Sequence, residues 1–231
     1  MLELNLCTIM ADNYIEKREE ELRNVPRGGH AYCSVSLNNL DALLARNRST
    51  RGFDSSYKVH ILQLRAIASV MDKIPSARNQ QVLRLRLVCG DEASKVLPLI
   101  KMGGALPQLH LPFPGTEPGA FIVICTNDPA APNLGFDEGV AAQSMCLKAV
   151  EMGLSCLIIK NFNSARIKEA LRIDSDRAGR PLTPLTVIAV GKGAEKISIE
   201  RVPDPSPLAY HRTEGGEHIV PKIRLEDIIC E

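Results

Sequence analysis

The sequence predicts an α+β domain in which a sheet is flanked by helices, and three observations lead to this fold class. Nearly continuous apolar runs at 120–126, 154–159 and 185–190 are typical of strands buried on both faces. Residues 82–88 alternate apolar and polar side chains, which indicates a strand with one apolar face. The helical stretches between these strands follow no regular βαβ rhythm, and no Gly-x-Gly-x-x-Gly follows a strand, so a Rossmann fold is disfavoured.

Two regions are expected along the chain, an extension over residues 1–33 and a main domain over residues 34–231. Residues 10–24 are strongly charged and carry few apolar side chains, so they predict a helix on the surface or on a partner subunit. Met10 offers an alternative start to Met1.

Apolar residues at helical spacing predict the helices of the main domain. The leucines at 37, 40, 43 and 44 predict a helix that buries one face, and residues 59–74 predict a second buried helix. The longest helix is expected over 136–152, with Gly153 at its C-terminal end. A further helix runs to about Leu171 from a cap at Asn163 or Ser164.

The remaining segments are expected to lie outside the core. Arg84 and Arg86 occupy the second face of their strand, which is expected to be solvated. Residues 91–102 suggest a short helix. Residues 103–119 and 195–218 are rich in Gly and Pro, so they predict an irregular loop and an excursion from the core.

Composition excludes several classes of function. The formal net charge of +1 gives no global field that recruits nucleic acid or an anionic membrane, so any anion binding must be local. Aromatic residues make up only 4% and Trp is absent, which argues against base-stacking platforms. Seven cysteines without a Cys-x-x-Cys pair and five scattered histidines favour reduced, buried thiols over a metal site. No apolar run of about 20 residues and no basic signal-peptide start occur, so a cytoplasmic protein is expected.

Cations and hydroxyls gather directly after the first leucine-rich helix, in the stretch Arg46–Phe53. Three arginines and two hydroxyl residues lie within six positions. One interpretation is that the cluster is a charged helix end, because the helix dipole stabilises cations at the C-terminus. The other interpretation is an anion site, because arginine guanidinium groups and hydroxyls together coordinate phosphate through charge-assisted hydrogen bonds. The cluster by itself leaves both interpretations open.

Four separated blocks resemble motifs of the FMN-dependent nitroreductases. Arg48–Phe53 resembles the R-R-S-x-R-x-F motif of that family, and Pro75–Gln81 resembles its P-S-x-x-N-x-Q motif. Ala141–Met145 with Gly153–Leu154 is similar to the A-x-Q-N-M…G-L helix and strand, and Pro221–Leu225 resembles the C-terminal P-K-x-R segment. The blocks follow the order of the family and cover about residues 37–231.

This resemblance implies a mixed, mainly antiparallel sheet and an intertwined homodimer with FMN at the subunit interface. It implies that the FMN phosphate is held by Arg48, Ser49, Lys222 and Arg224. It implies that Arg51 reaches the pyrimidine edge of the flavin, where a cation stabilises negative charge on the reduced ring. It also implies that a backbone N–H of the loop Lys160–Asn161 contacts flavin N5. Contacts to flavin bound mainly by the other subunit are implied for the block that contains Ser76, Asn79 and Gln81.

The sequence departs from the family pattern at four places. Asn47 stands where the first arginine of the entry motif is expected, and Val82–Leu83 replaces Pro-Trp. Lys160–Asn161 replaces Gly-Gly or Glu-Gly, which puts a cation near the N5 side of the flavin. The stretch between Val88 and Ala120 is shorter than in members with substrate-covering helices.

The implied function is an oxidoreductase that uses NAD(P)H to reduce a nitroaromatic, quinone or similar acceptor through bound FMN in a ping-pong cycle. No catalytic side-chain set is required, because the flavin carries the redox chemistry. An alternative is a flavin-binding protein with little or no NAD(P)H-driven turnover, which the loop Lys160–Asn161 and the short middle segment motivate. A third interpretation is the same fold without a cofactor.

Overall fold

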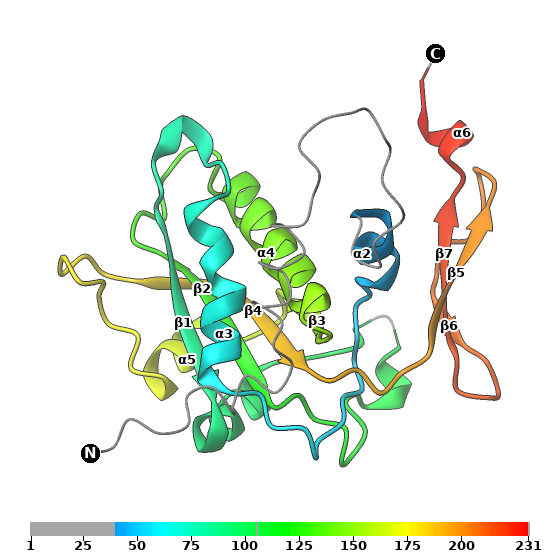
Figure 1. Ribbon diagram of the computed structural model, residues 1–231, viewed down its shortest axis with the longest axis horizontal. Coiled ribbons are helices and arrows are strands. Elements are labelled where there is room, and N and C mark those ends of the chain that lie inside the picture. Colours follow the sequence, from blue (N-terminus) through cyan, green and yellow to red (C-terminus); the bar gives the residue numbers. More distant parts are fainter. Residues whose placement is uncertain (1–39, 105, 231) are drawn as a thin grey trace, which may run out of the picture. The chain divides into compact units, whose positions relative to one another are not determined.

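The computed structural model describes residues 40–104 and 106–230, which contain two sheets (Figure 1). The helix expected over 10–24 and the extension over 1–33 lie outside the described residues, as does the beginning of the leucine-rich helix at residue 37. A compact unit of the chain starts at Leu40.

The central sheet has four strands in the order β1-β2-β4-β3, and each neighbouring pair is antiparallel. Its strands are β1 (Leu83–Cys89), β2 (Ala120–Thr126), β3 (Ser155–Ile159) and β4 (Thr183–Gly191). All seven residues of β2 are buried, as its continuous apolar run predicts. The four strands expected from the sequence are therefore confirmed.

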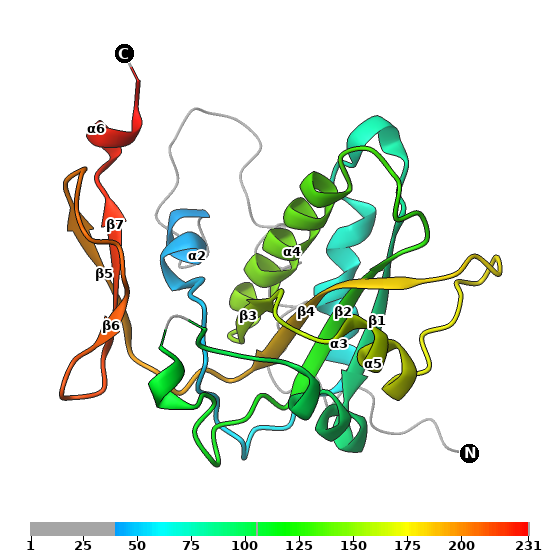
Figure 2. The same ribbon diagram turned by 180° about the vertical axis from the view of Figure 1, so that it is seen from behind.

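Two hydrophobic clusters cover the two faces of this sheet, and alternate residues of β2 separate them. Ile122 and Ile124 pack with α3 (Ile61–Ala68) and α4 (Leu134–Glu151) on one face. Phe121 and Val123 pack on the other face with α5 (Ser164–Ala170). Figure 1 and Figure 2 show the helices on these opposite faces.

The helix ends follow the expected local chemistry. α4 is followed by Gly153, whose φ of +74° lies in the left-handed region that glycine adopts without strain. The side chain of Asn163 accepts a hydrogen bond from the Arg166 N–H at 3.0 Å and caps α5. α3 begins with a capping box that the sequence analysis did not include, in which Gln63 accepts from the His60 N–H at 2.9 Å.

Short 3-10 helices replace the longer helical turns expected in two regions. α3 continues as η1 (Ser69–Asp72), and the helix expected over 91–102 is instead η3 (Gly90–Lys95) followed by η4 (Leu97–Leu99). Pro98 lies in the second of these turns, where its missing N–H prevents a continuous α-helix. Two further turns are η2 (Ala77–Asn79) and η5 (Pro107–Leu109).

The excursion expected over 195–218 is wrong in part, because this region supplies strands of a second sheet. We call this sheet the arm sheet; its strands are β5 (Ile197–Val202), β6 (His211–Arg212) and β7 (His218–Ile223). β7 lies between the other two, parallel to β5 and antiparallel to β6. The prolines at 203, 205 and 207 fall in the connection after β5, so they do not interrupt pairing. The short helix α6 (Leu225–Ile228) follows β7.

α2 (Leu40–Arg46) forms as expected, but the burial predicted for its apolar face is wrong for the described chain. No residue of α2 is buried, and the side chains of Leu40 and Leu44 are 60% and 40% exposed. Leu43 on the same face is half-buried, so the described part of the chain covers this apolar face only in part.

The face of β1 that carries Arg84 and Arg86 is paired rather than simply solvated. The Arg84 Nε lies 3.4 Å from Asp176 Oδ2, and the Arg86 guanidinium lies 2.6 Å from Glu92 Oε1. Hydrogen bonds from Arg180 and Asn127 also hold the pKa of the Asp176 carboxyl well below its usual range. The two arginines therefore fasten β1 to neighbouring loops.

None of the helices in the described part of the chain combines the length and the apolar character needed to cross a bilayer.

We expect Met145→Ala to lower the free energy of unfolding by about 2–5 kcal/mol, because Met145 is fully buried between α4 and the sheet and its loss leaves a cavity. Urea denaturation measures this difference. Phe136→Ala on the same helix is the control, since Phe136 is 67% exposed and its loss should change stability by less than about 0.5 kcal/mol. Equal effects of the two substitutions would contradict this account of the core.

Candidate functional site

The stretch Arg46–Phe53 leaves α2 and runs past the first residues of the edge strand β3. Ser49 forms a parallel bridge with Cys156, and the Thr50 N–H donates to the Cys156 carbonyl at 3.1 Å. Phe53 is 1% exposed and packs against Gly191, where a Cβ would lie 2.7 Å from the Phe53 ring. A buried aromatic and a sheet-like bridge therefore fix both ends of the segment that carries Arg48, Ser49 and Arg51.

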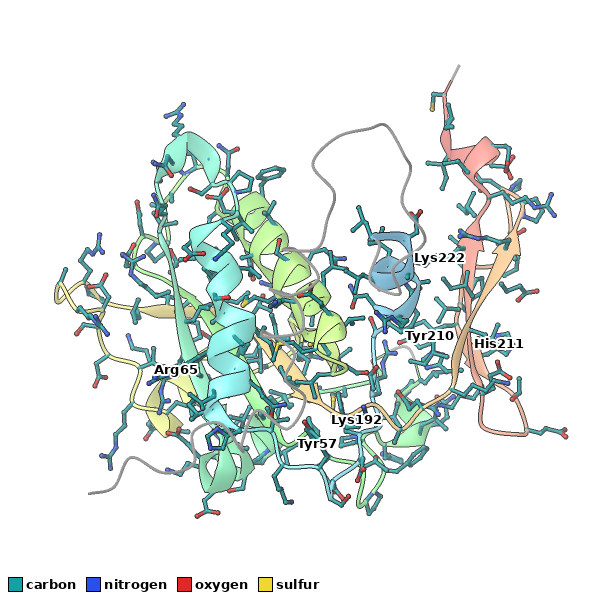
Figure 3. All side chains as sticks on the ribbon, viewed as in Figure 1. Tyr57, Arg65, Lys192, Tyr210, His211 and Lys222 are labelled. Atoms are coloured by element: carbon teal, nitrogen blue, oxygen red, sulfur yellow. The ribbon has the colours of Figure 1, made fainter. Side chains whose placement is uncertain are left out.

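One face of the arm sheet carries the C-terminal cations. Alternation along β7 places His218 and Lys222 on the same face, and Arg224 continues that spacing beyond the strand. The parallel register sets Arg201 of β5 opposite Lys222. Figure 3 shows Tyr210 and Lys222 on the side of the arm sheet that faces α2, whereas His211 points away.

Arg48 lies under the electrostatic influence of that face. Burial lowers the pKa of Arg48, and repulsion from Arg201 lowers it further. One guanidinium nitrogen donates to the Leu44 carbonyl at 2.7 Å, but the buried Nε has no hydrogen-bond partner among the described residues. This orphaned donor lacks the acceptor that buried polar groups normally have.

We call Arg48, Arg201, Lys222 and Arg224 the cation cluster. Among residues 40–104 and 106–230, no carboxylate lies within ion-pair distance of any of its members. Unneutralised cations with an orphaned donor are the donor set that a phosphate requires. The sequence did not mark Arg201 as a candidate, because the alternation that begins at Ile197 breaks at Arg201 and the pairing of this strand with β7 was not predictable.

Arg51 is held by the segment that joins β4 to the arm sheet and by the arm sheet itself. Its backbone N–H donates to Glu195 Oε2 at 2.5 Å, and its guanidinium donates to the Ser49 carbonyl at 3.0 Å. The guanidinium carbon lies 4.9 Å from the centre of the Tyr210 ring, which is a cation–π distance. The Arg51 Nε is buried and has no partner in the part of the chain that the structure describes, so this side chain also retains an unused donor there.

His218 is fully buried beside Tyr210, with ring centres 5.0 Å apart, and within residues 40–104 and 106–230 neither of its ring nitrogens has a hydrogen-bond partner. Burial lowers the pKa of His218, and repulsion from Arg51 and Arg212 lowers it further. Glu195 forms a largely buried ion pair with Arg212 and partly offsets these charges. The folded protein therefore favours neutral His218 at neutral pH.

A cavity of about 570 Å³ opens beside this group. Gly52, Phe113, Glu195 and Arg212 contribute to its lining. The Arg212 guanidinium lies 5.7 Å from the centre of the Phe113 ring. The volume is within the range of small-molecule sites.

Ser76, Asn79 and Gln81 form a loop of their own at the opposite end of the central sheet. The Gln81 side chain donates to Asn79 Oδ1 at 2.8 Å, and the Gln81 N–H donates to Ser76 Oγ at 3.3 Å. Gln81 lies just before β1, at the end of the sheet where Leu83 pairs with Thr126. Ser49 lies at the other end, because its partner Cys156 pairs with Val190, which in turn pairs with Ala120. Seven strand residues separate these ends by about 20 Å, so one chain does not bring the two groups together.

Lys160 and Asn161 follow β3 and lie about 13 Å along that strand from Cys156. The Lys160 ammonium donates to Glu138 Oε1 at 2.5 Å and to the Leu185 carbonyl at 2.7 Å. The Asn161 carbonyl accepts from the Lys101 N–H at 2.8 Å. The cation expected near flavin N5 is therefore neutralised by Glu138, and the loop is fastened on both sides.

The residues of this site fit FMN. The phosphate requires several charge-assisted donors, and the cation cluster offers four cations, of which Arg48 keeps an orphaned Nε. The adjacent Arg51 offers a second orphaned donor on a positioned guanidinium. Both groups lie on one segment next to β3, which ends at the Lys160–Asn161 loop.

The chain belongs to the nitroreductase family, because residues 44–192 match the sequence profile of that family. This match covers well over half of the chain. The arm sheet lies beyond it.

Solved structures share this fold at low sequence identity. A nitroreductase family protein from Streptococcus pneumoniae TIGR4 has 17% identity and a TM-score of 0.59, over 84% of this chain and 100% of that chain. An oxidoreductase containing FMN has 20% identity and a TM-score of 0.57, over 87% and 93%. An FMN-dependent nitroreductase from Clostridium difficile R20291 has 20% identity and a TM-score of 0.54, over 68% and 89%. A search of curated protein sequences found no match.

We expect stability to fall as the pH drops below about 6.5, in part because of His218. The unfolded chain takes up a proton near the ordinary pKa of 6.5, whereas the folded chain resists protonation until lower pH. Urea denaturation between pH 7.5 and 5 should show a weaker acid dependence for His218→Phe than for the wild type. His211→Phe, on the exposed side of the arm sheet, is the control; an unchanged acid dependence in His218→Phe would contradict the assignment.

Proposed function

We propose that the protein is an FMN-dependent oxidoreductase of the nitroreductase type that takes its electrons from NAD(P)H. The observation that carries this proposal is the cation cluster, which has no carboxylate partner in the described part of the chain and contains an orphaned, buried Arg48 Nε. Membership of the nitroreductase family supports the choice of a flavin phosphate as the anion. The FMN-containing proteins among the similar solved structures support it as well.

Each predicted residue has a role in this proposal. Arg48, Ser49, Lys222 and Arg224 bind the phosphate, and Arg201 joins them. Arg51 donates to the pyrimidine edge of the flavin, where its positive charge stabilises negative charge on the reduced ring. The Lys160–Asn161 loop supplies a backbone N–H to flavin N5, and Ser76, Asn79 and Gln81 contact flavin bound mainly by the partner subunit.

When bound, FMN would supply the redox chemistry of a ping-pong cycle, with NAD(P)H as the hydride donor and a nitroaromatic, quinone or similar compound as the acceptor. The residues of the chain bind and orient the reactants, and none of them is proposed to act as an acid, base or nucleophile. The Lys160–Glu138 ion pair keeps the N5 loop in place and leaves no free ammonium there.

The proposed site requires two chains, so we infer an intertwined homodimer. The distance of about 20 Å between the Ser49 and Gln81 ends of the sheet supports this inference, because one chain alone leaves the Ser76 loop away from the cation cluster. Exposed apolar side chains on α2 and around α6 also support a covering partner. These are Leu40, Leu44, Leu225, Ile228 and Ile229.

We further propose that residues 34–231 form the FMN-binding domain, that residues 1–33 form an extension, and that the protein works in the cytoplasm. Five cysteines in the described part of the chain are free thiols, which suits a reducing compartment. Burial raises the pKa of Cys125 to about 12, so this thiol is not a reactive nucleophile.

The purified protein should bind FMN and show a flavin absorbance spectrum. Arg201→Ala and Lys222→Ala should each weaken FMN binding about 10- to 100-fold, since each removes a charge-assisted hydrogen bond. Quenching of FMN fluorescence measures the affinity. Arg166→Ala, which removes an exposed cation from α5, is the matched control. A wild-type protein that fails to bind added FMN would refute the proposed function.

A flavin-binding protein with little turnover differs from the enzyme in one measurement. Under anaerobic conditions, NADH or NADPH should bleach the absorbance of the bound flavin in the enzyme. Persistent flavin absorbance with both nucleotides would favour the binding protein.

Mixed dimers provide a test of the two-chain site. A chain with Arg201→Ala and Lys222→Ala lacks the phosphate cluster, and a chain with Asn79→Leu lacks the contact from the partner. Each homodimer should lose FMN affinity, whereas a mixed dimer should regain one intact site and bind about one FMN per two chains, as measured by isothermal titration. If mixing restores no FMN binding, the phosphate cluster and the Asn79 contact belong to a site within one chain.

A further inference from the structure

Glu195 occupies an unusual position between Arg51 and the arm sheet. Its carboxylate accepts the Arg51 backbone N–H at 2.5 Å and pairs with the Arg212 guanidinium, and its side chain is only 7% exposed. Gly52 packs directly on it, since a Cβ at Gly52 would lie 3.0 Å from Glu195 Cγ. A buried carboxylate that holds two donors from distant segments defines their relative positions.

The arm sheet and its approach supply the other contacts to Arg51. Tyr210, immediately before β6, offers its ring to the Arg51 guanidinium at 4.9 Å. His218 of β7 packs behind that ring at 5.0 Å and limits its movement. Glu195, Tyr210 and His218 all lie beyond the segment 44–192 that matches the family. They are therefore features of the C-terminal part of this chain.

We propose that Glu195 is a positioning residue for Arg51, and that Glu195 and Tyr210 together aim the Arg51 guanidinium at the flavin. Glu195 fixes the backbone of Arg51, and Tyr210 fixes the direction of its side chain. The inference rests on the proposed function, because the aimed guanidinium is the one assigned to the pyrimidine edge of FMN. Its consequence is that the arm sheet sets both the affinity for FMN and the reduction potential of the bound flavin.

The charge balance of the group explains why a carboxylate is needed at this position. The charged and titratable groups around His218 are Arg51, Arg212, Glu195 and His211. Glu195 is the single anion in that set, so its loss leaves Arg51 and Arg212 to repel each other without compensation. We expect such repulsion to displace the Arg51 guanidinium, because its hydrogen bond within the described residues is the one to the Ser49 carbonyl at 3.0 Å.

Glu195→Gln tests the proposal, because it preserves the shape of the side chain and an acceptor oxygen but removes the charge. We expect FMN affinity to fall about tenfold and the midpoint potential of the bound flavin to become more negative. Fluorescence quenching and an anaerobic dye-coupled titration measure these two quantities in the holoprotein. Tyr210→Leu, which removes the aromatic face but no charge, should shift the potential in the same direction.

Glu217→Gln is the matched control. Glu217 also lines the cavity and is paired, in its case with Lys196 at 3.0 Å and with Ser198, but it has no contact with Arg51. This variant should leave the affinity and the potential unchanged. A shift of equal size in Glu217→Gln would overturn the proposal, because the effect would then reflect the charge of the arm sheet in general.

A double-mutant cycle separates positioning from a general loss of structure. In the Arg51→Ala background, Glu195→Gln should cause no further change in potential, because the group that it positions is absent. Additive effects would overturn the proposal. If the wild type binds FMN and both Glu195→Gln and Tyr210→Leu have the same FMN affinity and midpoint potential as the wild type, the positioning role is refuted but the proposed function is not. Absence of FMN binding in the wild type would refute the proposed function itself.

Discussion

The pairing of β2 with β4 is the constraint on which the rest of the structure depends. Both strands lie at the centre of the sheet, and β2 is buried along its whole length, so these two strands fix the positions of the two sheet ends. The segment that carries Ser49 joins one end through Cys156, and the Gln81 loop joins the other. The separation of these groups is therefore a direct consequence of strand length.

Two sets of cations in the described part of the chain, both named among the candidate site residues or their neighbours, differ in their compensation. Lys160 and Arg212 are each neutralised by a carboxylate with low exposure, Glu138 and Glu195. The cation cluster lacks such a partner in the described part of the chain, although Arg48 is partly buried and repelled by Arg201. Arg201, Lys222 and Arg224 are exposed, so the buried, orphaned Arg48 Nε is the feature of the cluster on which the proposed anion site rests.

Much of the fold could be predicted from the sequence, because local patterns determine it. Continuous apolar runs and alternation located the four strands of the central sheet, and Gly153 and Asn163 marked helix ends correctly. The arm sheet was not predicted as a sheet, since its prolines and short polar strands resemble a loop and its pairing joins distant segments.

The site was predictable only in part, for the same reason. The motif residues Arg48, Arg51 and Lys222 are recognisable in the sequence, whereas Arg201 joins them only through the parallel register of β5 and β7. The neutralisation of Lys160 by Glu138 also depends on packing between α4 and the end of β3. No local pattern records either contact.

The hydrogen bond between Arg51 and Glu195 joins residues that are 144 positions apart, and this separation has a consequence for folding. Closing a loop of that length carries an entropic cost that local contacts do not, so structures of this kind form late. During synthesis, the entry segment is made long before β7 emerges with Lys222. Arg48 and Lys222 can therefore come together only after residue 222 has left the ribosome, so the proposed anion site cannot close while only the entry segment and the central sheet have been made.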